Sequence, residues 1–280
     1  MSILAAVLLA LAAGITEVFP VSGTGHLFLL SKLLGVSTAG TAFQSFRAML
    51  YFGVAFGGIL FYHTQLGDML RENLVLLGLA RPSHRRGEPF GRRLGLLVLA
   101  AGLPLLPALL LNCIRDRMEQ DAGALAFIAL LLCISGALLY FAVRGARGKR
   151  SIHEMDLSDA LRVGLVQVLS VFPGLSRSGF AVSVLMSRGL DGAAAAEFTG
   201  LVGVPVFFGA GVVQLFAAKA GEGSFAAAPY LILGFALSAL SAFFSLHFFT
   251  ELMARRRPTG FAYWSWGAGI LALILFLISA

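Results

Sequence analysis

The segments FPVSGTGH (19–26) and FPGLSRSG (172–179) each interrupt a long apolar stretch, at about 3–34 and 158–190. Proline breaks a helix because it lacks an amide hydrogen, and clustered glycine weakens one. Backbone groups freed by such a break cannot face lipid, so they must be buried in protein or line a wet cavity. We therefore expect each stretch to fold as helix–loop–helix, entering the membrane and returning on the same side.

The composition supports a membrane protein. Hydrophobic residues make up 58% of the 280 residues and charged residues only 12%, whereas a soluble domain carries about 25% charged residues. The net charge of +7 comes from basic clusters at 81–93, 144–150 and 255–257, which border apolar segments. Basic residues in such places usually mark the cytoplasmic side, so we expect no nucleic-acid partner.

Six further segments are long enough to span a bilayer, which takes about 20 apolar residues. They lie at roughly 46–63, 94–113, 123–144, 196–218, 228–249 and 261–279. The expected fold class is therefore an all-α integral membrane protein, with about six transmembrane helices and two re-entrant helix–loop–helix hairpins.

The two broken stretches also resemble one another. Each has a glycine, a polar Glu17 or Gln167, then Phe-Pro and a Ser/Gly-rich loop, with further spans following. We expect one membrane domain, 1–280, whose halves 1–144 and 158–279 are joined by a basic cytoplasmic loop at 145–157. The loop charges then place the two hairpins on opposite sides of the membrane, which is an inverted-topology repeat with polar sites near the midplane.

Three ionisable residues lie inside the broken stretches: Glu17, His26 and Arg177. Ionisable groups at membrane depth are costly and are functional candidates by default. Histidine changes protonation near neutral pH, and a carboxylate can orient it or hold a divalent ion. The structural alternative is an ion pair that only holds the hairpins together.

The residues around Arg177 favour an anionic ligand. Gly174, Ser176 and Ser178 precede an apolar helical stretch, and amides at a helix start, hydroxyls and a guanidinium make a phosphate cradle. In the first loop Ser22, Thr24 and Gly25 offer a second set of hydroxyls and amides. We therefore expect Arg177 and His26 to meet in one lipid-accessible chamber that binds a phosphate and supports phosphoryl transfer.

The two loops resemble the signatures of the bacterial undecaprenyl-diphosphate phosphatases, the bacitracin-resistance family, and the resemblance covers nearly the whole chain. It implies hydrolysis of a polyprenyl diphosphate to the monophosphate carrier needed for cell-wall synthesis. It also implies a multi-pass protein of the bacterial inner (plasma) membrane, with its active site opening to the outer face. By this resemblance Glu17, His26 and Arg177 are catalytic, and Thr24 and Ser176 match hydroxyl positions.

Three positions depart from the family pattern: Ala13 and Arg47 stand where acidic or amide residues are usual, and Gly23 stands where a second serine is usual. Losing a carboxylate weakens a site for Mg²⁺ or Ca²⁺, which leaves Glu17 as the one candidate metal ligand. Arg47 makes the site more cationic, and Gly23 removes a candidate nucleophile. A mechanism with His26 as base or nucleophile is unaffected.

The sequence alone leaves two alternatives open. One is a transporter or flippase of polyprenyl phosphate that uses the same scaffold without hydrolysis. The other is an ion or solute transporter, which leaves the Ser-Arg-Ser loop unexplained. The expected partners are the polyprenyl diphosphate lipid and the membrane, with a homodimer left open.

Overall fold

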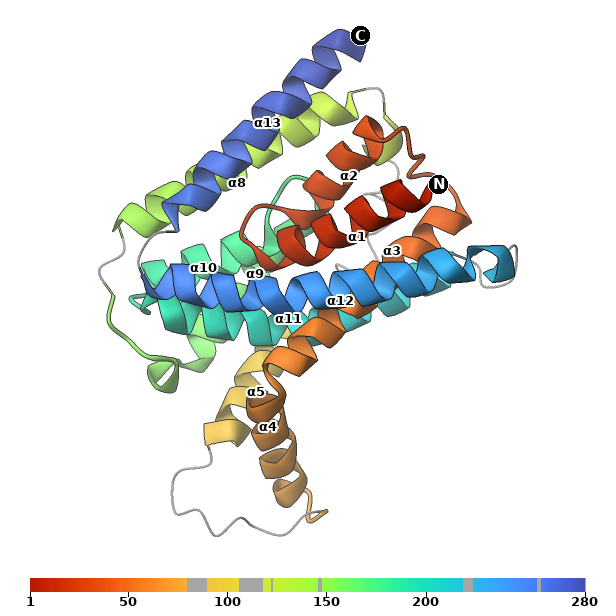
Figure 1. Cartoon of the computed structure of the whole chain (residues 1–280). Helices are drawn as coiled ribbons and strands as arrows, with labels where there is room; N and C mark the ends of the chain where they lie inside the picture. Colours follow the sequence, from red (N-terminus) through yellow and green to blue (C-terminus); the bar gives the residue numbers. More distant parts are fainter. Residues whose placement is uncertain are drawn as a thin grey trace.

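The computed structural model describes residues 1–79, 90–105, 118–121, 123–145, 148–218, 224–255 and 258–279. Within these ranges the regular structure is helical, apart from one isolated bridge between Arg150 and Leu190. Figure 1 shows how the helices are arranged. Their bounds are α1 Ile3–Val18, α2 Gly23–Leu33, α3 Thr41–Phe61, α4 His63–Leu76, α5 Phe90–Gly102, α8 Ala124–Gly145, η1 Ile152–Glu154, α9 Leu157–Gln167, η2 Val168–Val171, α10 Arg177–Ser187, α11 Gly192–Ala217, α12 Ser224–Ala254 and α13 Thr259–Ser279.

Five of these helices are long and apolar enough to cross a membrane: α3, α8, α11, α12 from Ala228 and α13. They coincide with five of the six predicted spans, and many of their large apolar side chains face outward, as lipid-facing residues should. The sixth predicted span, 94–113, begins in α5 and then passes outside the described residues. The chain is a multi-pass helical membrane protein.

Both broken stretches fold as helix–loop–helix, as the sequence predicts. Helix α1 ends at Val18, just before Pro20, and α2 begins at Gly23; in the second stretch Pro173 lies between η2 and α10. In Figure 1, α1 and α2 lie to the right of α9 and α10, and the tips of the two hairpins face each other.

The tips are in direct contact. The Gly174 amide donates a hydrogen bond to Ser22 Oγ (3.1 Å), and Ser178 Oγ donates one to the Phe19 carbonyl (2.9 Å). Buried backbone groups need such partners where water is absent. The polar groups of each loop are therefore partly satisfied by the other loop.

The same capping pattern starts the second helix of each hairpin. Ser22 Oγ accepts from the Gly25 amide, and Ser176 Oγ accepts from the Gly179 amide, so each serine is an N-cap. Ser22 does this with φ 70°, a left-handed conformation that is uncommon outside glycine. The first tip thus carries local backbone strain, which other contacts must hold in place.

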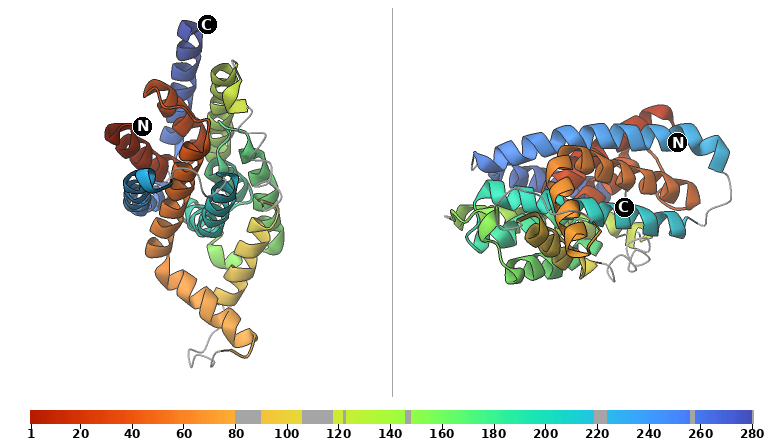
Figure 2. Two further views of the ribbon diagram at one scale, coloured as in Figure 1. Left: turned by 90° about the vertical axis from the view of Figure 1, so that its right-hand side faces the viewer. Right: turned by 90° about the horizontal axis from the view of Figure 1, so that it is seen from below.

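The spanning helices pack closely around the hairpins. Helix α12 contacts α1, α3 and α11, and a side chain at Gly14 or Gly53 would overlap α12. Helices α8 and α13 form a pair against the other side of the hairpins, while α4 and α5 extend away from the rest (Figures 1 and 2). Glycine therefore permits the close helix approach that membrane bundles use in place of a hydrophobic driving force.

The basic connection between the halves is tied to the second hairpin through Asp159. This side chain is fully buried and accepts from Arg150 Nη2 and Arg188 Nε, each at 2.8 Å. Burial by itself would raise the pKa of the Asp159 carboxyl, but the hydrogen bonds from the two arginines outweigh it and hold the pKa below its usual value. The carboxylate is therefore charged, and stabilising, throughout the neutral range.

We predict that Asp159→Asn lowers the free energy of unfolding by about 2 kcal/mol at pH 7, because hydrogen bonds to a charged acceptor are lost. A lowered pKa means that the wild type loses this contribution only as the pH falls through that pKa, so the difference from the variant shrinks in acid. Thermal unfolding in detergent measures it. The exposed Asp68→Asn is the control, and equal effects of the two variants would contradict the assignment.

Candidate active site

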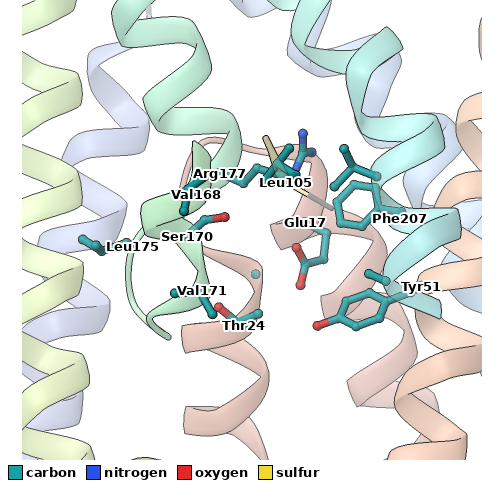
Figure 3. Close-up of a pocket in the computed structure, with 13 residues that line it drawn as sticks. Glu17, Thr24, Tyr51, Leu105, Val168, Ser170, Val171, Leu175, Arg177 and Phe207 are labelled. Atoms are coloured by element: carbon teal, nitrogen blue, oxygen red, sulfur yellow. The ribbon is translucent and has the colours of Figure 1, made fainter. Parts of the chain in front are cut away.

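Glu17 and Arg177 line one cavity of about 80 Å³ at the meeting point of the hairpins (Figure 3). Its wall is built from α1, α2, α3, η2, α10 and α11. A carboxylate and a guanidinium from the two separate hairpins thus share one space, as the sequence predicts for these two residues.

Arg177 is the first residue of α10, directly after the capping Ser176. Its guanidinium lies over the Phe207 ring, with Cζ 4.5 Å from the ring centroid. Nε and Nη1 are buried and have no hydrogen-bond partner among the described residues. Buried donors are nearly always satisfied in a functioning protein, so these two N–H groups indicate a place where an anion or water binds.

Glu17 lies in the last turn of α1 and is only 7% exposed. Its carboxylate points into the cavity and lies below the Arg177 guanidinium in the view of Figure 3, and its negative charge stabilises that guanidinium. Gly23 makes this position possible, because a Cβ there would overlap the carboxylate. The absence of a side chain at Gly23 therefore has a structural effect: the Glu17 carboxylate occupies the space that a side chain at position 23 would take.

Of the predicted phosphate-binding residues, Thr24 lines the cavity, while Ser22, Ser176 and Ser178 cap helices or join the tips. The backbones of Gly25 and Gly174 form the close contact between the loops: a Cβ on Gly25 would lie 3.0 Å from the Gly174 Cα. The three serines and two glycines therefore mainly hold the two loops in position around the cavity. A serine that caps a helix and a serine that binds phosphate cannot be told apart in the sequence, and the hydrogen bonds of the structure identify Ser22 and Ser176 as caps.

Ser135 of α8 is a further residue that holds the second tip, and no sequence pattern points to it. Its hydroxyl donates to the Gly174 carbonyl (3.0 Å) and accepts from the Ser176 amide (2.9 Å). Gly174 itself has φ 106° and lies against Leu131, so a side chain there would be strained and crowded. The second loop is therefore clamped to α8 as well as to the first loop.

The structure does not bring His26 into the chamber with Arg177, contrary to expectation. His26 Nδ1 lies 2.8 Å from the Ser22 carbonyl, and Nε2 lies 2.8 Å from Nε1 of Trp264 in α13. The indole N–H can only donate, so Nε2 must be the acceptor and Nδ1 must carry the proton. The imidazole is therefore held neutral in one tautomer, on the α13 side of the first hairpin.

The departures at 13 and 47 have structural reasons. Ala13 is fully buried in an apolar cluster of α1, α2 and α3, where a charge would lie in apolar surroundings. Arg47 is almost fully buried and pairs with Glu119 at 2.7 Å, with Phe43 beside its guanidinium. The expectation of a more cationic site is corrected, because Glu119 neutralises Arg47.

Tyr51, Ser170 and Phe207 also line the cavity, and sequence reasoning did not select them. The Tyr51 and Phe207 rings stack with centroids 6.1 Å apart, next to Arg177. Aromatic residues are common throughout the spans, so nothing in the sequence marks these two. Tyr51 and Phe207 line the cavity because α3 and α11 are turned so that these two side chains face it.

The donor set of the cavity does not form a metal site by itself. Among the described residues no three or more His, Cys, Asp and Glu side chains gather as ligands, and Glu17 is the one acidic residue of the lining. Mg²⁺ and Ca²⁺ normally take several oxygen ligands. Glu17 alone would therefore hold a divalent ion only weakly, and Mg²⁺ or Ca²⁺ stays a prediction.

Residues 6–271 match the family model described as the bacitracin resistance protein BacA. A protein of Syntrophotalea carbinolica named undecaprenyl-diphosphatase is 32% identical over 271 residues, which is 96% of this chain and 97% of that protein. One of the same name from Anaeromyxobacter sp. is 31% identical, over 98% of this chain and 88% of its own length. A third, from Acidothermus cellulolyticus, is 29% identical over 92% and 91%.

We predict that protonation of His26 breaks its contact with Trp264, because an imidazolium has no acceptor nitrogen. In a Trp266→Phe background Trp264 is the sole tryptophan, and its emission should change as the pH is lowered through the titration of His26. The change should vanish on His26→Gln and persist on His247→Gln, which alters an exposed histidine of α12. A pH response that survives His26→Gln would disprove the contact.

Proposed function

Because the chain belongs to the family of the bacitracin resistance protein BacA, we propose that it is an undecaprenyl-diphosphatase. It hydrolyses undecaprenyl diphosphate to the monophosphate carrier and inorganic phosphate, which recycles the carrier for cell-wall precursors. The observation that carries the proposal in this chain is the cavity shared by Glu17 and Arg177, where two guanidinium donors lack a partner within the described part of the chain.

The same proposal includes six spans and two re-entrant hairpins in an inverted repeat, with halves 1–144 and 158–279. It is supported by the facing hairpin tips and by the serine caps at Ser22 and Ser176, which occur at matching places in both loops. The basic connection 145–157 then lies in the cytoplasm of a bacterial cell, and the cavity opens to the outer face of the plasma membrane.

Arg177 binds the diphosphate. A guanidinium presents donors in a fixed fork that fits phosphate oxygens, and it attracts an anion strongly in a site of low dielectric constant. The ring of Phe207 holds the guanidinium from one side, so that Nε and Nη1 stay directed at the ligand. Thr24, at the start of α2, adds a hydroxyl on the opposite wall.

Glu17 accepts a proton from the attacking water. The water oxygen forms a bond to the terminal phosphorus as the bond from that phosphorus to the bridging oxygen breaks. The electron pair of the broken bond stays on the bridging oxygen, which leaves on the lipid monophosphate. Arg177 stabilises the charge that develops there, and phosphoryl transfer depends almost entirely on such electrostatic stabilisation and on positioning.

His26 acts from outside the cavity in the conformation described. Its Nδ1–H donates to the carbonyl of Ser22, the residue with the strained φ, and so supports the first loop between Glu17 and Thr24. A role as base or nucleophile requires Nε2 to leave Trp264 first.

We predict that Arg177→Ala and Glu17→Gln each lower kcat/KM for undecaprenyl diphosphate by about 10²–10³-fold, because each removes charge stabilisation or the proton acceptor. Phosphate release by the purified protein measures this. Arg71→Ala, in the α4 arm, is the control and should retain activity. Wild-type protein that binds the lipid but releases no phosphate would instead support a transporter.

We also predict that Gly23→Ala lowers kcat about tenfold, with little change in thermal stability. The new methyl group displaces the Glu17 carboxylate, and the misplaced carboxylate slows the reaction. Stability changes little because the carboxylate is the flexible end of its side chain and can move without shifting the backbone. Gly67→Ala is the matched control, since a Cβ there has no atom of the described residues within 4 Å. An unaltered kcat in Gly23→Ala would rule out a catalytic Glu17 in the position described.

A further inference from the structure

A second cavity, of about 400 Å³, lies between α5 and α11. The described residues that line it are all apolar or glycine. They include Leu99 of α5, Leu103 just after α5, and Pro205 of α11. Leu99 is 63% exposed and Leu103 is 64% exposed, so this space opens at the surface of the bundle. We call it the α5–α11 groove.

The groove adjoins the Glu17–Arg177 cavity, with two wall residues in common. Leu105 and Val206 line both spaces, and Phe207 and Ala210 continue the wall of α11 into the cavity. Pro205 leaves the helix without one backbone hydrogen bond at this point, which loosens the groove wall. A molecule with a charged head beside Arg177 and an apolar body could therefore occupy both spaces at once.

We propose that the α5–α11 groove binds the isoprenyl units that follow the first one in the lipid substrate, while the diphosphate lies beside Arg177. The proposal rests on the proposed function, which supplies the occupant. A prenyl chain is wholly apolar and must leave the polar cavity through an apolar exit to reach the bilayer. Only a chain long enough to reach past the cavity makes contact with the groove, so filling the groove should affect long-chain substrates and spare the shortest one.

A competing apolar groove of about 300 Å³ lies between α1, α12 and α13. It is lined by Phe19, Leu252, Phe261 and Trp264 among others, on the side of the first hairpin that carries His26. None of its lining residues is shared with the Glu17–Arg177 cavity. It is therefore the matched control for the α5–α11 groove.

Each groove has a glycine at which a large side chain can be added. Among the described residues, no atom lies within 4 Å of a Cβ at Gly102 or at Gly260, so a large side chain can be attached at either place without a clash at its base. Gly102→Trp fills the α5–α11 groove, and Gly260→Trp fills the other. Hydrolysis of undecaprenyl diphosphate and of the C5 compound dimethylallyl diphosphate is then compared for the two variants.

Gly102→Trp should lower kcat/KM for undecaprenyl diphosphate at least tenfold, mainly through KM, and leave the value for the C5 substrate within twofold. Gly260→Trp should change neither. A selective loss in Gly260→Trp assigns the tail to the other groove, and an equal loss on both substrates in Gly102→Trp shows general damage; either overturns the proposal. Failure of the proposed function looks different, because the wild type would then release phosphate from neither substrate.

Discussion

The contact between the two hairpin tips is the constraint on which the site depends. Each loop exposes amides and carbonyls in the middle of an apolar bundle, where an unpaired group is expensive. The bonds from Gly174 to Ser22 and from Ser178 to Phe19 satisfy part of both loops at once. Since Glu17 precedes Phe19 by two residues and Arg177 adjoins Ser178, the same bonds that satisfy the loops also bring the carboxylate and the guanidinium together.

The two loops contribute unequal parts to one site. Alignment on the capping serines places Gly23 of the first loop opposite Arg177 of the second, since each follows its serine directly. One position supplies the guanidinium, and the other supplies the space into which the Glu17 carboxylate fits. The next positions also differ: Thr24 faces the cavity, whereas Ser178 bonds to the opposite tip. The second loop thus supplies the binding group, and the first loop supplies the space for Glu17.

The features predictable from the sequence are those set by local physics. Spans follow from the length of apolar runs, and apolar helices of spanning length occur at five of the six predicted places. The helix–loop–helix breaks follow from proline and glycine at 20, 23, 173 and 174, and both are present. Glu17 and Arg177 stand out because a charge at that depth is costly and is seldom kept without a function. These arguments need no knowledge of which helices become neighbours.

The features that could not be predicted depend on neighbours distant in the chain. The direction of His26 is set by Trp264, which lies 238 residues away. Phe207 and Ser135 reach the site only through the rotation of α11 and α8, which hydropathy does not encode. The charge of Arg47 is balanced by Glu119, its partner 72 residues later. Residue type suggested chemistry for His26 and Arg47 but not for Phe207 or Ser135, and for all four only packing decided whether the side chain reaches the site.

The most direct test of the account is the coupling between Glu17 and Arg177 in a double-mutant cycle. Glu17→Asp and Arg177→Lys retract each charged group while leaving measurable activity, and kcat/KM for undecaprenyl diphosphate is determined for both and for the double variant. Two groups held around one phosphate should show a coupling above about 1 kcal/mol, so that the double variant is clearly better than the product of the single effects. Effects that simply multiply would mean that the hairpins do not bring the two side chains into one site.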